Sequence, residues 1–209
     1  MFLKYFIAIS LLTSGVSIIS WPLISKFLNI NLLFKNIINK MTCDKDNFIQ
    51  STLYDSFPIF IPNRNGFRRI KPDQFVPVNK SWGYNNRTVA LRIPSGKDEA
   101  RRIEHRVASA DANAYLTLAS ILAGVLNGIN NKLQPTHFIE YGTNAGIETQ
   151  ADPEIPTSLE NSLIRFENSK ILKEYFGENY LKLYASVKKG EENLYNSTFI
   201  PKEEYDYYL

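Results

Sequence analysis

The sequence predicts an α+β fold in which an antiparallel hairpin packs with C-terminal helices. Residues 88–93 and 102–107 alternate apolar and polar side chains, the period of a strand with one buried face. A stretch with turn chemistry, residues 94–99, lies between them. After residue 110 the apolar side chains recur at helical spacing instead. The 209 residues suffice for a sizeable core, and the single cysteine, Cys43, excludes a disulfide framework and a cysteine-based zinc site.

The first 45 residues form a separate hydrophobic segment, which we expect to contain a helix. Residues 5–25 carry no charge, and 21 residues match the length of one membrane span, although hydroxyl residues, a glycine and a proline dilute it. A buried helix is the alternative interpretation. The lysines after this stretch would keep the rest of the chain on the cytoplasmic side. We therefore expect a cytoplasmic protein, with membrane anchoring through residues 5–25 as the alternative.

The middle of the chain changes from irregular to helical. Four prolines within residues 58–80 prevent a long helix there, and the predicted hairpin follows. Residues 111–129 are rich in Ala and Leu and predict a helix that Ser109 or Asp111 caps. The polar residues 134–156, with several glycines and prolines, indicate a long surface loop.

The last third of the chain predicts three helices and a last turn. A helix should begin at Thr157 or Ser158, and Gly177 should end a short one. Residues 178–196 predict an amphipathic helix, and residues 202–208 a last turn. One side of the amphipathic helix should carry Tyr180, Leu183, Tyr184 and Val187.

Positive charge is concentrated in the middle of the chain. Residues 64–106 contain eleven Lys and Arg against four Asp and Glu, a net charge of +7, whereas the whole chain carries only +3. Eight of the eleven cations are arginines, whose planar guanidinium group fits carboxylate and phosphate oxygens. The segment therefore indicates an anion-binding site.

Strand geometry predicts where these charges meet. Side chains of a strand alternate between its two faces, so the apolar side chains of both strands should share one face. The opposite face should then gather Arg92, Arg102, Glu104 and Arg106. One interpretation is an arginine–glutamate network on a solvated surface, which contributes little to stability. The other is a site where Glu104 holds a divalent cation and the arginines hold oxyanions, since Mg²⁺ prefers one or two carboxylates plus phosphate oxygens.

Several motifs in this part of the chain resemble the C-terminal part of the glutamine synthetase family. The motifs are residues 86–94 (NRTVALRIP), 101–106 (RRIEHR) and 110–116 (ADANAYL), preceded by 62–69 (PNRNGFRR). The resemblance covers about residues 52–209. Residues 82–87 (WGYNNR) and 104–106 (EHR) look most like the γ-glutamylputrescine synthetase branch. Residues 46–209 are thus similar to the C-terminal part of that family's catalytic domain.

The resemblance implies an ATP-dependent ligase that phosphorylates the side chain of glutamate and then transfers the γ-glutamyl group to ammonia or an amine. It implies Mg²⁺ or Mn²⁺ as cofactor, and no nucleic-acid partner is expected. Carried over by position, Arg69 and Arg106 correspond to residues that bind glutamate. Arg87 corresponds to a catalytic residue near the γ-phosphate and is also an ATP contact, with Arg92 and Arg102 as further ATP contacts. Glu104 corresponds to a metal ligand.

The chain also departs from the family pattern. Phe75 stands where ammonia-using members carry a glutamate, which favours an organic amine as acceptor, and Glu99 replaces a lysine that serves ATP. The family's N-terminal domain, its other metal-binding glutamates and its catalytic histidine segment have no counterpart, and His137 is in the wrong place to replace the latter. We therefore expect a truncated member, inactive without a companion chain or a homo-oligomeric ring to complete its site. The alternatives are a non-catalytic anion-binding protein and a membrane-tethered interaction protein.

Overall fold

The computed structural model describes residues 48–72, 75–97, 102–134, 138–139 and 151–198. The predicted N-terminal helix, the predicted membrane span at residues 5–25 and the predicted last turn at 202–208 lie outside these ranges, so they stay predictions. None of the helices within the described ranges combines the length and the apolar character that a membrane crossing needs.

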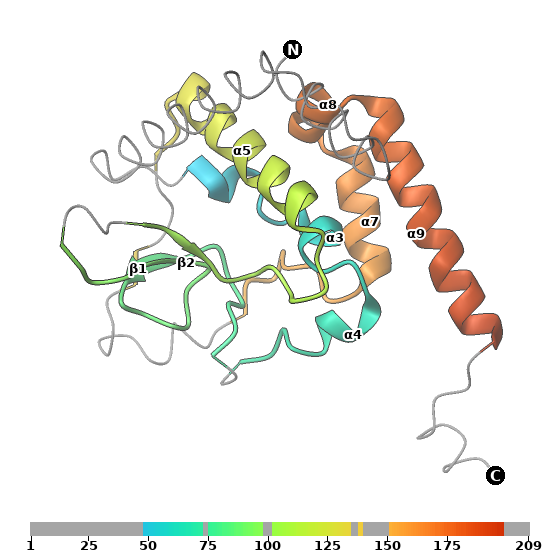
Figure 1. Ribbon diagram of the computed structural model, residues 1–209, viewed down its shortest axis with the longest axis horizontal. Helices are drawn as coiled ribbons and strands as arrows, with labels where there is room; N and C mark the ends of the chain where they lie inside the picture. Colours follow the sequence, from blue (N-terminus) through green and yellow to red (C-terminus); the bar gives the residue numbers. More distant parts are fainter. Residues whose placement is uncertain (1–47, 73–74, 98–101, 135–137, 140–150, 199–209) are drawn as a thin grey trace, which may run out of the picture.

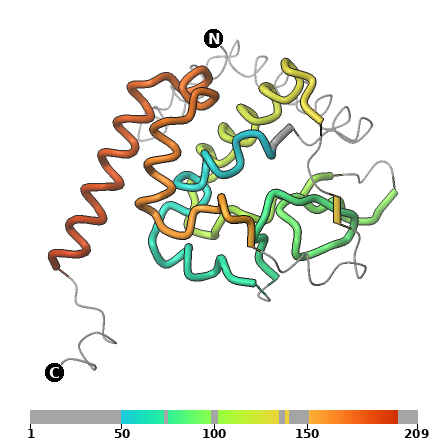
Figure 2. Tube along the Cα trace, turned by 180° about the vertical axis from the view of Figure 1, so that it is seen from behind, coloured from blue at the N-terminus to red at the C-terminus, as the bar shows by residue number. Residues whose placement is uncertain are grey.

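The described residues form an α+β arrangement in which a three-stranded sheet lies beside a set of helices (Figure 1). Seen from behind, the 3₁₀ helix η1 (Phe48–Thr52) lies against α5 (Ala114–Asn131) (Figure 2). The elements in chain order are η1 (Phe48–Thr52), α3 (Phe57–Phe60), α4 (Arg64–Phe67), β1 (Trp82–Tyr84), β2 (Leu91–Ile93), β3 (Glu104–His105), α5 (Ala114–Asn131), α7 (Leu159–Asn168), α8 (Lys170–Phe176) and α9 (Glu178–Thr198).

The predicted antiparallel pairing is present, but both strands are shorter than expected. Strand β2 pairs with β3 in the register Leu91 to His105 and Arg92 to Glu104. Residues 87–90 bend instead of extending, because the side chain of Asn86 accepts hydrogen bonds from the amide and the hydroxyl of Thr88, at 2.8 and 2.7 Å. A third strand that the sequence did not predict, β1, pairs in parallel with β2.

Two helix ends lie where the sequence predicts them, and the predicted cap of a third helix differs. Ser158 caps α7 by accepting a hydrogen bond from the amide of Asn161, and Gly177 ends α8 at a φ of 88°. The cap of α5 is Asn113, whose side chain accepts from two amides of the first turn. The predicted caps were wrong because Ser109 and Asp111 bond to each other and to the preceding segment, through Phe60 and Asn63 respectively.

The core runs from the sheet to α9. Its buried cluster includes Trp82 and Leu91 of the sheet, Phe60 of α3, and Leu181 of α9. On the predicted apolar side of α9, Tyr180 and Tyr184 pack against the core, whereas Leu183 and Val187 are exposed. Part of the predicted surface loop is also buried: Ile155 joins the core, and Asp152 accepts a hydrogen bond from the Tyr54 hydroxyl at 2.9 Å.

Candidate functional site

The candidate site lies on the face of the β2–β3 pair that points away from the core. Leu91 and its partner His105 face the core, where Leu91 is fully buried and the His105 ring lies 4.4 Å from the Phe60 ring. The next pair, Arg92 and Glu104, therefore points to the opposite face. The hairpin thus separates an apolar face from a charged one, as the alternation in the sequence indicated.

Three of the four predicted side chains meet in an ion cluster, which we call the Arg–Glu–Arg triad: Arg92, Glu104 and Arg106. Glu104 Oε1 accepts from Arg106 Nη1 at 2.6 Å, and Glu104 Oε2 lies 3.3 Å from Arg92 Nη1. The two arginine side chains are about one-fifth exposed and the glutamate about one-third. One carboxylate faces two guanidinium groups, so the triad has a net positive charge.

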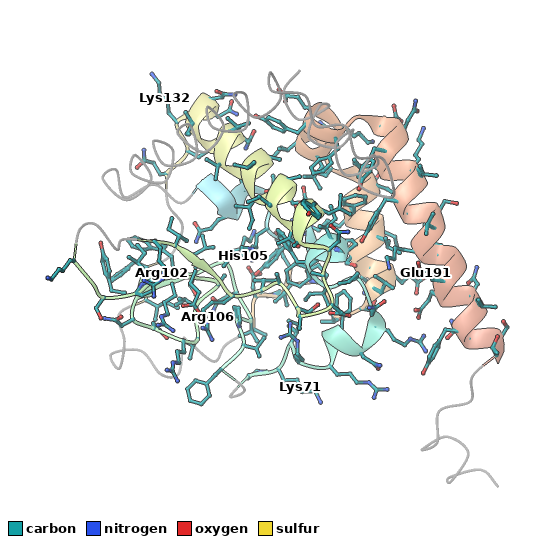
Figure 3. All side chains as sticks on the ribbon, viewed as in Figure 1. Lys71, Arg102, His105, Arg106, Lys132 and Glu191 are labelled. Carbon is teal, nitrogen blue, oxygen red and sulfur yellow. The ribbon has the colours of Figure 1, made fainter. Side chains whose placement is uncertain are left out.

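Arg102, the fourth predicted member, has an exposed side chain. Figure 3 shows Arg102 and Arg106 on the same part of the molecule as His105. Arg102 precedes β3 and so comes from the same chain segment as the triad.

Two backbone carbonyls fix the guanidinium group of Arg106. Its Nε donates to the carbonyl oxygen of Arg87 at 3.1 Å, and its Nη2 donates to the carbonyl oxygen of Phe75 at 3.2 Å. Phe75 has a φ of 50°, an unusual value for a bulky residue, and its side chain is two-thirds exposed. These bonds bring the segment before β1 and the turn before β2 to the triad.

Arg87 and Arg69, the other two predicted site residues, both have exposed side chains near the end of β3. Arg87 follows the buried Asn86, and the carbonyl of Arg87 accepts the hydrogen bond from Arg106. Arg69 Nη2 donates to the carbonyl of Val107, the residue after Arg106, at 3.4 Å. All six predicted residues thus come from segments that contact the hairpin or belong to it.

An open hollow of about 500 Å³ adjoins this region. Three cationic side chains line it together with Val76: Arg68, Arg69 and Lys71. The hollow therefore offers an anion a positively charged wall beside one of the predicted glutamate contacts.

His105 is a half-buried titratable group behind the triad. Both ring nitrogens are shielded from solvent and have no hydrogen-bond partner among the described residues. This burial lowers the pKa of His105 to about 4, because the charged imidazolium would lose its hydration. At neutral pH the ring is therefore uncharged and acts as an apolar contact on Phe60.

The described residues do not by themselves make a metal centre. Both oxygens of Glu104 are engaged by arginines, and no group of three or more His, Cys, Asp or Glu that could hold a metal occurs in the described ranges. If one arginine releases its oxygen, Glu104 can offer that oxygen as a single metal ligand. A hard divalent cation needs more oxygen ligands than this.

Sequence reasoning missed the carbonyl contacts of Phe75, Arg87 and Val107. No side-chain pattern in the sequence reports which way a carbonyl in an irregular segment points, and the positive φ of Phe75 is visible only in the structure.

Comparison with known proteins identifies a protein family. A sequence model of the glutamine synthetase catalytic domain matches residues 49–207. The chain is 41% identical to gamma-glutamylputrescine synthetase of Escherichia coli over 136 residues, which is 65% of this chain and 28% of that protein. It is 34% identical to type-1 glutamine synthetase 2 of Dictyostelium discoideum over 158 residues, 75% of this chain and 30% of that protein. It is 33% identical to glutamate–isopropylamine ligase of a Pseudomonas species over 151 residues, 72% of this chain and 32% of that protein. The chain spans less than a third of the length of these relatives.

Proposed function

The chain belongs to the glutamine synthetase family, and from this premise we propose that it carries the glutamate- and phosphate-binding part of an ATP-dependent ligase that joins glutamate to an amine. The observation that carries the proposal is the Arg–Glu–Arg triad on the outward face of the hairpin. Phosphoryl transfer between two anionic substrates requires fixed positive charge where negative charge develops. A cluster with two arginines and one carboxylate supplies such charge.

Within this proposal the five arginines divide into three roles. Arg69 and Arg106 bind the carboxylate groups of glutamate, and the cationic hollow beside Arg69 fits such a ligand. Arg92 and Arg102 contact the phosphates of ATP. Arg87 lies in the bend before β2. It acts as a catalytic residue at the γ-phosphate, where its guanidinium group stabilises the charge that develops during transfer.

The proposed acceptor is an organic amine. The exposed Phe75 provides no carboxylate that could receive ammonium at the edge of the triad. Two of the relatives are named for the amines putrescine and isopropylamine, and the identity with the putrescine enzyme exceeds that with the Dictyostelium protein, 41% against 34%.

We also propose that this chain has no turnover by itself. Glu104 is the single carboxylate of the triad, whereas the Mg²⁺ or Mn²⁺ that the family implies needs several oxygen ligands. The remaining ligands would come from other subunits of a ring or from a companion chain. A cytoplasmic location fits this function, and the non-catalytic anion-binding alternative lacks support from the comparisons.

A chimaeric enzyme tests the function directly. In the E. coli relative, the 136 matched residues are replaced by those of this chain, and ligation of glutamate to putrescine and to ammonia is measured. We expect activity with putrescine above that with ammonia. The change Arg87→Ala should abolish turnover, and Lys182→Ala, which removes an exposed cation on α9, should not. A folded chimaera without activity towards either acceptor would refute the proposal.

A further inference from the structure

Arg64, the first residue of α4, contacts the far end of the chain. Its guanidinium group forms an ion pair with Glu192, donates to Asn196 Oδ1 at 2.8 Å and lies 4.7 Å above the ring of Tyr195. Tyr195 and Asn196 lie three and four residues after Glu192 on α9, so all three partners lie on one side of that helix. We call this group of four residues the α4–α9 clamp.

Helix α4 depends on contacts of this kind. It has only four residues, and an isolated helix of that length is unstable in water. Its N-cap residue, Asn63, makes no side-chain capping bond to the helix. Phe67 is the one residue of α4 that is buried. Together with the hydrogen bond from Asn63 to Asp111, the clamp therefore fixes the first turn of α4.

The same short helix leads directly into a site residue. The amide of Arg69 donates to the carbonyl of Gly66 in α4 at 3.2 Å, and the amide of Ile70 donates to Phe67 at 3.0 Å. The Arg69 side chain then reaches Val107, next to the triad. In Figure 3, Lys71 marks the chain just after this turn, and Glu191 marks the part of α9 next to Glu192. The position of Arg69 thus follows from the position of α4.

We propose that Arg64 is a positioning residue, which holds α4 on α9 and thereby places Arg69 for glutamate binding. The inference rests on the proposed function for its ligand, but the mechanical part stands on the contacts alone. Arg64 itself touches α9 and not the triad, so its effect on glutamate passes through the backbone of α4 and the turn that follows.

The test compares four forms of the chain in two measurements. The forms are the unchanged protein, Arg64→Ala, Arg64→Lys and the matched control Glu178→Gln, which breaks the separate Glu178–Lys182 pair near the start of the same helix. The first measurement is amide hydrogen exchange at Gly66, Arg68, Arg69 and Ile70, with the amides of α5 as a reference for the intact fold. The second is the affinity for glutamate and for a non-hydrolysable ATP analogue.

We expect Arg64→Ala to speed exchange in the four amides about three- to tenfold and to weaken glutamate binding by a similar factor, with the ATP analogue unaffected. Arg64→Lys should restore part of both effects, because a lysine keeps the charge for Glu192 but not the planar fork that also reaches Asn196. The Glu178→Gln protein should behave like the unchanged one.

Different failures would overturn different statements. Unchanged exchange in Arg64→Ala would show that the clamp does not hold α4. Faster exchange with unchanged glutamate affinity would overturn the positioning role. No glutamate binding by the unchanged protein would contradict the proposed function and its assignment of Arg69, while the exchange rates would still decide whether Arg64 fixes α4.

Discussion

The imidazole of His105 and the carboxylate of Glu104 are adjacent in the sequence but lie in opposite environments. His105 packs on Phe60 with both nitrogens unpartnered among the described residues, and Glu104 forms ion pairs with two arginines. A strand places neighbouring side chains on opposite faces, so one residue can serve the core while the next serves the site. Each environment leads to a separate prediction.

Acid should destabilise the protein through His105. Its pKa is about 4 in the folded chain and 6.5 in the unfolded chain, so between these values the unfolded state binds the extra proton. The contribution of the neutral His105 to the free energy of unfolding is therefore fully present above pH 6.5. It falls by about 1–3 kcal/mol as the pH drops towards 4. Urea denaturation at pH 7 and pH 4.5 measures this loss. His105→Leu should keep its stability at pH 7 and lose less at pH 4.5; an equal loss in both proteins would exclude His105 as the cause.

Removing the carboxylate of the triad should strengthen anion binding. Glu104 competes with any ligand for Arg92 and Arg106, so Glu104→Gln removes the negative charge that both guanidinium groups face. We expect tripolyphosphate, titrated without metal ions at low salt, to bind the variant about three- to tenfold more tightly than the unchanged chain. Glu178→Gln is again the control, because Glu178 pairs with the exposed Lys182 on α9. Weaker binding by Glu104→Gln would contradict this account of the triad.

At the scale of elements, two glycines differ in what a side chain would meet. A Cβ at Gly83 in β1 would lie 2.2 Å from the carbonyl oxygen of Ile139, whereas a Cβ at Gly190 in α9 would meet nothing within 4 Å. The chain beside Gly83 is tied by the amide of Ile139, which donates to Trp82 at 2.9 Å. Gly83→Ala should therefore cost about 1–3 kcal/mol and disrupt that contact.

Gly190→Ala is the matched control for that prediction. An exposed glycine inside a helix is less favourable than alanine, so this change should stabilise the chain by about 0.5–1 kcal/mol. Chemical denaturation of both variants checks the difference in sign. A stable Gly83→Ala protein would mean that β1 and residues 138–139 do not approach as closely as the structure places them.

The elements that the sequence predicted well are those that local physics determines. Period-two alternation gave the hairpin and placed Arg92, Glu104 and Arg106 on one face, and Ser158 and Gly177 marked helix ends by their capping chemistry. Each of these signals operates within a few residues of the chain.

The elements that the sequence did not predict depend on contacts between distant segments. Strand β1 has three residues, too few for a periodic pattern, and forms by pairing in parallel with β2. Helix α9 carries apolar side chains on opposite sides, and the sequence does not report that Leu181 and Ala185 meet the core while Leu183 does not. The contacts of Arg69 and Phe75 likewise join irregular segments to Val107 and Arg106, which are distant in the sequence.

At the scale of the whole molecule, α9 connects segments that are far apart in the sequence. Arg64 of α4 binds it through Glu192, the Tyr184 hydroxyl donates to the Pro58 carbonyl of α3 at 2.8 Å, and Lys189 pairs with Glu167 of α7 at 2.6 Å. The buried cluster that contains Leu181 also contains Trp82 in the sheet. This continuity implies that the sheet with the triad and the C-terminal helices unfold as one unit.

Leu181→Ala tests whether the sheet and the C-terminal helices unfold as one cooperative unit. Leu181 is fully buried, so its truncation should cost about 2–4 kcal/mol, whereas Leu183→Ala, at an exposed position on the same helix, should change stability by less than about 0.5 kcal/mol. Urea unfolding is followed by the fluorescence of Trp82, in a Trp21→Phe background, and by helical circular dichroism. In a single cooperative unit the change in α9 must lower both midpoints equally, although Trp82 lies in the sheet. A Trp82 transition that stays in place while the helical signal shifts would show that the sheet folds independently of α9, and the site could then form without the C-terminal helix.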